Sequence, residues 1–360
     1  MLLSLVVHVN SLRYWIPAAA LLGMAPAFVL GRLAGLLLLP RRARRRMDDR
    51  MYALYQRAVL CFFENFTAVE VVVYGDIPAQ RENVIYIANH QSTVDWVVAD
   101  MVAVRQGALG DMRYILKDGL KWLPLYGWYF SQHGGTYVKR SLKFDEKMMV
   151  RKLHEYVKMD SPMFLVIFPE GTRYNPELPQ AIEASQSFAE KEGLDVLNHV
   201  LTPRVKATEA AIAALRGHVR AIYDVTVAYE GSVDMQGKRK AAPTMPEFLC
   251  GTCPRVHIHF ERLDLHDVPN GGLKFKRWLH KRFQKKDRLM AAFYGDGLGG
   301  LTFPAKGKTS SLGLHANLPS LLIAGGLTLP LLLTSTGRRV YFGTWLYGTL
   351  LGWLWVLVRP

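Results

Sequence analysis

An uncharged stretch near the N-terminus, from Tyr14 to Leu30, constrains the fold more strongly than any other feature of this sequence. It reads YWIPAAALLGMAPAFVL and continues beyond Arg32 into LAGLLLLP. A helix of about 20 apolar residues spans the hydrocarbon core of a bilayer, where every backbone polar group needs an internal partner. We therefore expect residues 1–40 to form a membrane anchor.

A cluster of arginines, RRARRR, follows this stretch at Arg41–Arg46. Such a cluster is typical of the cytoplasmic flank of an anchor, whereas a signal peptide would end in a small-residue cleavage site. The next apolar segment, Met51–Phe66, fits a core helix, an interfacial helix or a second membrane contact. We assign residues 41–80 to this basic flank and to the apolar interfacial or membrane helix.

Two further uncharged runs, Leu318–Thr336 and Val340–Val358, lie near the C-terminus and are separated only by GRR. We predict a membrane hairpin over residues 318–358, preceded by a linker at 301–317. If both runs span the membrane and the middle of the chain is cytoplasmic, the two arginines lie on the far side, against the positive-inside rule. A re-entrant hairpin, or a single true span, would remove this conflict.

Charge and cysteine content narrow the class of protein. The chain has 360 residues, is 50% hydrophobic and carries a formal net charge of +15, so we expect contact with an anionic surface. Beside these apolar runs, a lipid bilayer is the better candidate, and we expect no nucleic acid partner. Three cysteines do not indicate a disulfide framework, and the CGTC motif at Cys250–Cys253 has no second pair to complete a metal site. We predict no bound metal.

Between the terminal segments, apolar runs alternate with segments of helical periodicity. The runs expected to be strands lie at 69–75, 83–89, 134–140, 163–171, 224–231 and 256–263. Helices are expected at 97–108, 144–159 and 179–192, with a basic amphipathic helix, packed on the domain or on anionic lipid, at 273–295. This alternation predicts an α/β fold over residues 81–300, with a mixed, largely parallel sheet flanked by helices. Ligands of such sheets bind at the carboxyl ends of the strands.

The stretch VIYIANHQSTVDW places a histidine and an aspartate directly after one of these strands. Five residues of continuous helix would separate His90 and Asp95 by about 140°, so they meet only if His90 precedes the helix and Asp95 lies in its first turn. The aspartate would then hold one imidazole nitrogen and leave the other free to act as a base. STVD is also a capping-box pattern, in which Asp95 binds a backbone N–H. Capping and catalysis are compatible interpretations of this spacing.

A second polar motif, FPEGTR, follows the strand expected at 163–171. Its Pro and Gly would shape a turn that presents Arg173, whose guanidinium suits phosphate, while an ordinary surface Glu–Arg pair is the simpler interpretation. A third segment, 115–140, fits a phosphate pocket beside an apolar groove, because aromatics and glycines surround Lys117, Lys121, Lys139 and Arg140. We expect His133, in the same segment, to be structural.

These motifs resemble those of the glycerolipid acyltransferases, and in particular the 1-acylglycerol-3-phosphate acyltransferase family. NHQSTVD matches their His-x4-Asp block, GGTYVKR is similar to their second block, FPEGTR matches their third, and LTPR resembles their fourth. The second block departs from the pattern, with Tyr-Val-Lys-Arg where many relatives have Phe-Ile-Asp-Arg. The resemblance covers residues 60–265 and extends to the C-terminal hairpin.

The resemblance implies a membrane-bound O-acyltransferase that moves an acyl chain from acyl-CoA to the free sn-2 hydroxyl of lysophosphatidic acid, giving phosphatidic acid. His90 would be the general base and Asp95 its partner. The substrate-binding residues would be Lys117, Gly135, Arg140, Glu170, Gly171, Thr172 and Arg173. Acyl-CoA is then a co-substrate, and we expect no cofactor.

Two alternatives to this function remain. One is an acyltransferase for another lysophospholipid, such as lysophosphatidylglycerol or lysocardiolipin. The other is a non-catalytic, membrane-tethered protein that binds anionic lipid. For its location we expect a multi-pass protein of the endoplasmic reticulum membrane, with the mitochondrial outer membrane and the nuclear envelope as alternatives.

Overall fold

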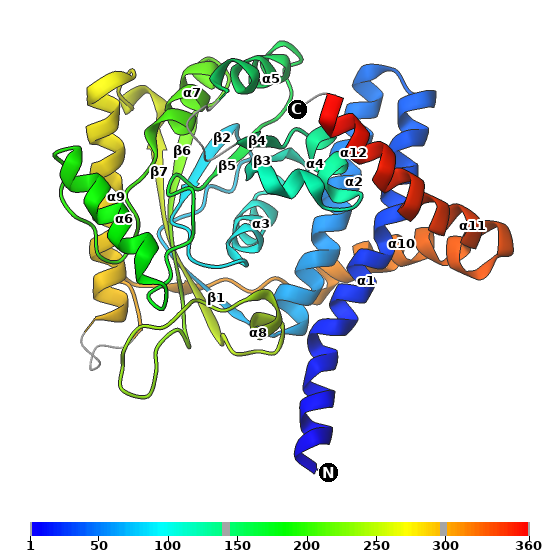
Figure 1. Ribbon diagram of the computed structural model, residues 1–360, viewed down its shortest axis with the longest axis horizontal. Helices are drawn as coiled ribbons and strands as arrows, with labels where there is room; N and C mark the ends of the chain where they lie inside the picture. Colours follow the sequence, from blue (N-terminus) through cyan, green and yellow to red (C-terminus); the bar gives the residue numbers. More distant parts are fainter. Residues whose placement is uncertain (1, 139–144, 296–300, 359–360) are drawn as a thin grey trace.

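An eight-stranded sheet lies at the centre of the computed structural model, which describes residues 2–138, 145–295 and 301–358 (Figure 1). Neighbouring strands follow the order β4-β3-β5-β2-β6-β7-β1-β8. The β6–β7 and β1–β8 pairs are antiparallel and the other neighbours are parallel, which confirms the predicted mixed, largely parallel sheet. The strands are β1 (Glu70–Tyr74), β2 (Val84–Ala88), β3 (Met112–Lys117), β4 (Thr136–Val138), β5 (Phe164–Ile167), β6 (Ala221–Tyr229), β7 (Arg255–Asp264) and β8 (Lys308–Thr309).

Helices cover both faces of this sheet (Figure 1). One face packs against α2 (Arg41–Leu60), α3 (Asp95–Arg105) and α8 (Met245–Leu249). The other packs against α5 (Glu146–Lys158), α7 (Val205–Leu215) and α9 (Gly272–Tyr294), while α6 (Pro179–Lys191) lies further out. Every residue of β2 is therefore buried, which explains why its sequence is continuously apolar rather than alternating.

Two apolar segments, for which the sequence allowed either a core or a membrane-surface role, contribute to the core. The Met51–Phe66 segment forms the end of α2 and a π-helical turn, Cys61–Phe66, with Leu60 and Phe63 buried. Helix α9 lies at the side of the sheet opposite the terminal helices, and its residues Leu279 and Phe283 are fully buried. The amphipathic pattern of α9 is thus accounted for by packing on the domain.

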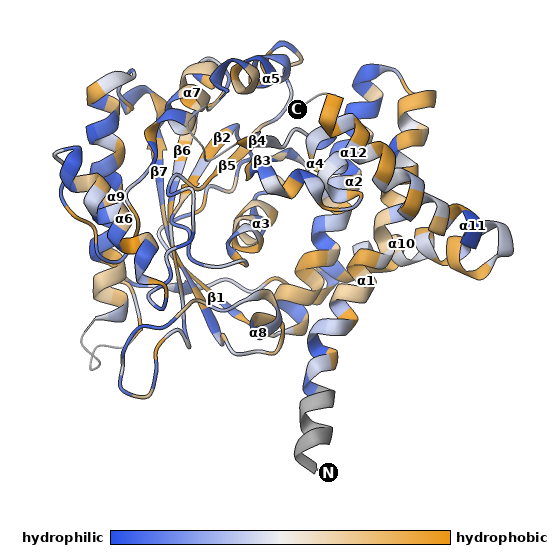
Figure 2. Ribbon diagram, in the orientation of Figure 1, coloured by the Kyte–Doolittle hydropathy of each residue, from blue (hydrophilic) through white to orange (hydrophobic). Residues whose placement is uncertain are grey.

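The terminal helices gather at one side of the domain, and Figure 2 shows their hydrophobic character. They are α1 (Leu2–Leu38), α10 (Leu314–Leu333), α11 (Ser335–Gly343) and α12 (Thr349–Val358), with a π-helical segment between the last two. Three stretches are long and apolar enough to cross a membrane, namely Asn10–Leu38, Leu314–Leu333 and Ser335–Val358. Arg338, near the start of the third stretch, donates to the carbonyls of Leu332 and Leu333 at 3.1 Å each. This arginine therefore caps the end of α10, which gives it a local structural role.

The C-terminal hairpin packs closely against the segment that follows β3. This segment consists of a 3-10 turn, Asp118–Trp122, and helix α4 (Tyr126–His133). A Cβ at Gly352 would lie 3.1 Å from Trp128, so glycine permits the close approach of α12 to α4. The indole N–H of Trp353 donates to the carbonyl of Trp122 at 2.9 Å. The apolar hairpin is thus attached to the loop region at the carboxyl end of β3.

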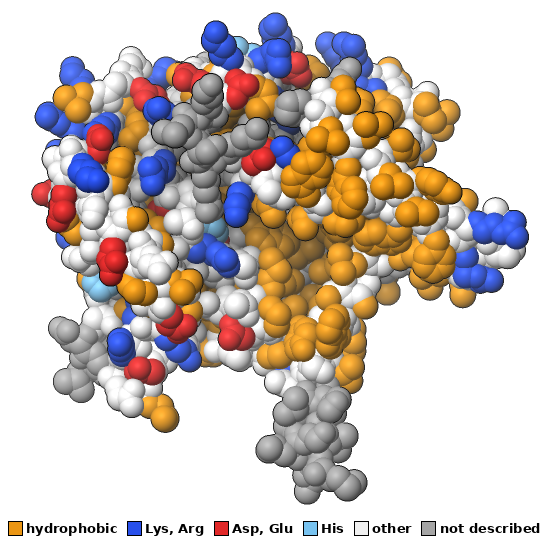
Figure 3. Space-filling model, in the orientation of Figure 1, with side chains coloured by type: hydrophobic (Ala, Val, Ile, Leu, Met, Phe, Trp, Pro, Cys, Tyr) orange, Lys and Arg blue, Asp and Glu red, His pale blue; other side chains and the backbone are white. Residues whose placement is uncertain are grey.

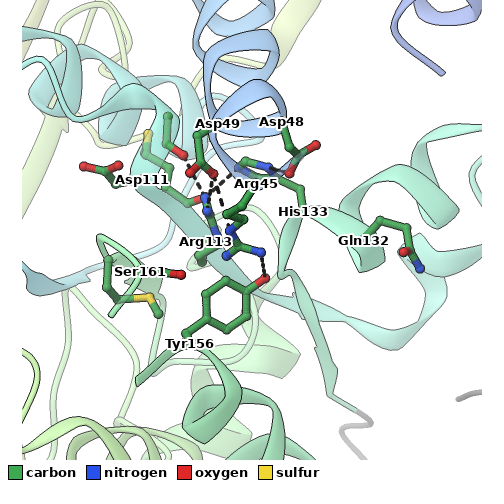
Figure 4. A network of polar contacts seen from close by, with 12 residues as sticks. Arg45, Asp48, Asp49, Asp111, Arg113, Gln132, His133, Tyr156 and Ser161 are labelled. Atoms are coloured by element: carbon green, nitrogen blue, oxygen red, sulfur yellow. Dashed lines mark hydrogen bonds and ion pairs between the residues drawn. The ribbon is translucent and has the colours of Figure 1, made fainter. Parts of the chain in front are cut away.

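A buried polar network joins α2 to β3 and α4 (Figure 4). Arg113 donates to Asp49 at 2.6 Å and to Nε2 of His133 at 2.7 Å, and Nδ1–H of His133 donates to Asp48 at 2.8 Å. Burial, with the nearby arginines, holds the pKa of His133 well below its usual range. Asp48, Asp49 and His133 have ligand atoms close enough together for a metal ion, but the guanidinium of Arg113 already occupies this cluster. His133 is structural, as predicted.

This network predicts a large loss of stability in the Arg113→Met variant. Methionine fills similar space but leaves Asp49 and His133 without their donor in the interior, which costs roughly 3–5 kcal/mol of the free energy of unfolding. Chemical denaturation of the purified protein in detergent would measure the change. The control is Arg151→Met, because Arg151 is exposed on α5, and we expect that variant to stay within about 0.5 kcal/mol of wild type. Equal stability of the two variants would contradict the prediction.

Candidate active site

The candidate site lies where the carboxyl ends of β5, β2 and β6 meet. These three strands are parallel neighbours, so the loops after Ile167, Ala88 and Tyr229 leave the same edge of the sheet. The NHQSTVD and FPEGTR motifs begin two of these loops. The sheet topology therefore brings together two motifs that are about 80 residues apart in the sequence.

His90 and Asp95 form a hydrogen-bonded pair at this edge. His90 lies in the loop after β2, and Asp95 is the first residue of α3. Nδ1–H of His90 donates to Oδ2 of Asp95 at 2.7 Å, because an ionised carboxylate only accepts. The imidazole stacks on Phe168, and its side chain is 23% exposed. Among the residues that the structure describes, none hydrogen-bonds to Nε2, so this nitrogen is available as a base.

The carboxylate of Asp95 also organises the surrounding backbone. Oδ2 accepts the N–H of Gln91 at 2.7 Å and that of Ser92 at 2.9 Å, while Oδ1 accepts the hydroxyl of Tyr229 at 2.6 Å. The bond from Ser92 is one half of the predicted capping box, and the Ser92 hydroxyl accepts from Val94 instead of completing the other half. One carboxylate thus binds the backbone of the loop that leads into α3 and also holds the histidine, a pairing that the spacing predicted. Tyr229 was not predicted, because nothing local in the sequence links the end of β6 to Asp95.

Glu170 lies directly behind His90 and holds its backbone. The buried carboxylate accepts the N–H of His90 at 2.8 Å through Oε1 and the N–H of Leu201 at 3.0 Å through Oε2. Burial raises the pKa of Glu170 to about 8, while the two backbone N–H groups act in the opposite direction. Glu170 therefore joins the first, third and fourth motif loops from the inside of the fold.

The remaining residues of the FPEGTR turn face outward. Gly171 has φ of +70°, a left-handed conformation that favours glycine, and its N–H closes the turn onto Phe168 at 3.1 Å. Thr172 is partly exposed and Arg173 is exposed. Among the described residues, none pairs with the Arg173 guanidinium. This turn therefore directs a free cation away from the protein, beside the loop of His90.

Of the residues predicted near β3 and β4, Lys117 lies further along the same edge of the sheet, whereas Gly135 lies at the amino end of β4. Lys117 ends β3 and is exposed, one strand beyond β5. Gly135 is structural: its N–H donates to Phe130, its carbonyl accepts from Lys152, and a Cβ there would lie 2.9 Å from the Phe130 carbonyl. Arg140 lies outside the described residues.

The surface beside the site is hollowed and apolar. Figure 3 shows a hollow lined by hydrophobic side chains between the sheet domain and the terminal helices, with Lys and Arg side chains along its margin on the domain side. A ligand with a charged head and an apolar tail would find both kinds of surface next to each other here.

Comparisons with known proteins agree with this geometry. A family model described as acyltransferase matches residues 70–230, and one described as acyltransferase C-terminus matches residues 247–317. The chain is 55% identical over 365 residues to mouse (Mus musculus) 1-acyl-sn-glycerol-3-phosphate acyltransferase epsilon, covering 100% of both chains. It is 34% identical to probable 1-acyl-sn-glycerol-3-phosphate acyltransferase 5 of Arabidopsis thaliana, over 65% of this chain and 60% of that one. It is 31% identical to lysocardiolipin acyltransferase 1 of Danio rerio, over 74% of this chain and 67% of that one.

The raised pKa of Glu170 predicts a pH-dependent effect of the Glu170→Gln substitution. The unfolded chain loses this proton near the ordinary pKa of 4.5, whereas the folded protein keeps it up to about pH 8. Between these values the folded state binds more protons, so this group lowers the free energy of unfolding as pH rises, by at most about 1.4 kcal/mol per pH unit. Glutamine does not titrate. The stability of wild type relative to Glu170→Gln should therefore fall from pH 4.5 to 8 and then level off.

Chemical denaturation of both proteins across this pH range would test the expectation. Glu183→Gln is the matched control, because Glu183 is exposed on α6 and should show no such trend. A difference between wild type and Glu170→Gln that is constant over this range would contradict the assigned titration.

Proposed function

Because this chain belongs to the 1-acyl-sn-glycerol-3-phosphate acyltransferase family, we propose that it transfers an acyl chain from acyl-CoA to the free sn-2 hydroxyl of lysophosphatidic acid, giving phosphatidic acid. The observation that carries the proposal is the His90–Asp95 pair, in which Nδ1 lies 2.7 Å from Asp95 and Nε2 has no hydrogen-bond partner among the described residues. A histidine held in one tautomer is suited to remove a proton from an alcohol.

In the proposed mechanism, Nε2 of His90 takes the proton of the sn-2 hydroxyl as its oxygen attacks the thioester carbonyl of acyl-CoA. Asp95 stabilises the imidazolium that forms and keeps its ring in place. The tetrahedral intermediate then collapses, the C–S bond breaks, and the imidazolium returns the proton to the thiolate of CoA. His90 is neutral again at the end, and the protein forms no covalent intermediate.

Two exposed cations among the described residues of the site would bind the acceptor. Arg173 and Lys117 are both exposed at the carboxyl ends of strands, and a phosphate monoester carries the complementary charge. The hollow beside them would receive the apolar chain of the lysolipid. We propose that Gly171 and Thr172 shape the turn that carries Arg173, and that Glu170 holds this turn against the loop of His90.

We also propose that the enzyme is membrane-bound through its three candidate spans. These helices adjoin the hollow, so the acyl acceptor would reach the site from the bilayer. The endoplasmic reticulum membrane is the proposed location, with the mitochondrial outer membrane and the nuclear envelope as alternatives.

Acceptors other than lysophosphatidic acid remain alternatives because of the likeness to a lysocardiolipin acyltransferase. A panel of lysophosphatidic acid, lysophosphatidylglycerol and lysocardiolipin with one acyl-CoA, monitored by release of CoA thiol, would distinguish them.

The mechanism predicts that His90→Ala loses at least about 10²–10⁴-fold in kcat, the usual contribution of a general base. The fold should be retained, because the side chain is partly exposed and the backbone bond to Glu170 remains. The measurement is CoA thiol release from acyl-CoA and lysophosphatidic acid. His154→Ala, which changes an exposed histidine on α5, should keep wild-type turnover. Near-normal turnover of His90→Ala would exclude His90 as the base.

The proposed role of Arg173 predicts a rise in KM for lysophosphatidic acid in the Arg173→Ala variant. Loss of one charged contact to phosphate should raise this KM by roughly 10-fold or more, with KM for acyl-CoA changed little. Arg220→Ala removes an exposed cation at the opposite, amino end of β6 and serves as the control for net charge. If only the KM for acyl-CoA rose in Arg173→Ala, Arg173 would be reassigned to the acyl donor.

A further inference from the structure

Arg239 makes polar contacts with two of the loops that surround the catalytic pair. It lies between β6 and α8, outside the four motifs. One terminal nitrogen of its guanidinium donates to Oε1 of Gln91 at 2.8 Å, and the other donates to the carbonyl of His199 at 3.0 Å. Gln91 follows His90 in the first motif loop, and His199 precedes the LTPR motif.

Two tyrosines fix the plane of this guanidinium. The ring of Tyr174 lies 4.3 Å from the guanidinium carbon, and that of Tyr294 lies 4.4 Å from it. Both tyrosines are buried, and Tyr174 belongs to the loop of the FPEGTR motif. Contact with aromatic faces stabilises a partly desolvated cation and limits its motion. Arg239 thus contacts three motif loops at once, through Gln91, Tyr174 and His199.

Two of these loops, those of Gln91 and Tyr174, in turn fix part of the catalytic pair. The N–H of Gln91 donates to Oδ2 of Asp95, and its side-chain amide donates to the carbonyl of Val227 at 2.7 Å. The N–H of Tyr174 donates to the carbonyl of His90 at 2.7 Å. The guanidinium therefore lies one contact away from both members of the pair without touching either.

We propose that Arg239 is a positioning residue for the proposed reaction: by joining Gln91, Tyr174 and His199, it holds the backbone of His90 and the carboxylate of Asp95 in the geometry for proton transfer. This inference rests on the proposed function. A guanidinium suits this role because a planar fork can donate in two directions while it also contacts aromatic rings. Its terminal nitrogens are bound to protein acceptors, whereas Arg173 has no such partner among the described residues.

The first test compares kcat with KM in Arg239→Ala and Arg239→Lys. A displacement of reacting groups by about 1 Å costs up to roughly 100-fold in rate, so we expect kcat of Arg239→Ala to fall by roughly 10- to 100-fold. KM for lysophosphatidic acid should stay within twofold of wild type. Arg239→Lys should be intermediate, because an ammonium keeps the charge but not the fork, and added guanidinium should restore part of the turnover of Arg239→Ala. The control is Lys238→Ala, an exposed neighbour on the same loop.

A double-mutant cycle tests the route through Gln91. If Arg239 acts through this side chain, Gln91→Ala should lower kcat by itself, and adding Arg239→Ala should cost much less than it does in wild type. If Arg239→Ala is poorly folded, the same cycle can be carried out with Arg239→Lys, because it requires only that each variant has measurable activity.

The outcomes separate this inference from the proposed function. If wild type does not acylate lysophosphatidic acid, the proposed function fails and Arg239 is not at issue. If wild type is active, two results would overturn the role of Arg239. One is unchanged kcat in both Arg239 variants. The other is a rise in KM for lysophosphatidic acid with kcat unchanged, which would make Arg239 a ligand of the phosphate. Strictly additive effects in the cycle would also overturn the route through Gln91.

Discussion

The buried carboxylate of Asp95 is the interaction on which the site depends. An ionised carboxylate in the interior is stable only when hydrogen-bond donors surround it, and Asp95 has four: the imidazole of His90, two backbone N–H groups and the hydroxyl of Tyr229. Each donor comes from a segment that must adopt one conformation to reach it. The same charge that orients the histidine therefore also fixes the start of α3 and ties β6 to the loop after β2.

The apolar terminal helices impose the second constraint, because they form one side of the hollow beside the site. The hairpin packs on the segment after β3 through Gly352 and the bond between Trp353 and Trp122. That segment begins directly after Lys117, an exposed cation at the end of β3. The apolar surface of the hairpin and the cationic end of β3 are therefore connected through the segment that follows β3. A lysolipid, which has an apolar chain and an anionic head, has the matching arrangement.

The sequence predicted those features that local patterns encode. Strands covered on both faces showed as continuous apolar runs, and the spacing of His90 and Asp95 allowed a pair across a loop and a helix start. Strand β3 was not predicted, because its buried Arg113 interrupts the apolar pattern and is compensated by partners from α2 and α4. Tyr229 and Arg239 were missed for a related reason: they reach the site through the sheet topology and a long loop, and neither has a local signal.

The described Lys and Arg side chains of the protein fall into two groups, those with a partner inside the fold and those without one, and the difference bears on function. Arg113 and Arg239 have carboxylate, carbonyl, amide or aromatic partners inside the fold, so an anion would have to displace those partners to bind them. Lys117 and Arg173 are exposed and have no such partner among the described residues. A cation that gains no contact within the protein does not stabilise the fold in this way, and its position at the carboxyl end of a strand is where ligands of open sheets bind. In the proposed function, Lys117 and Arg173 rather than the bound arginines therefore define the side of the site from which an anionic substrate approaches His90.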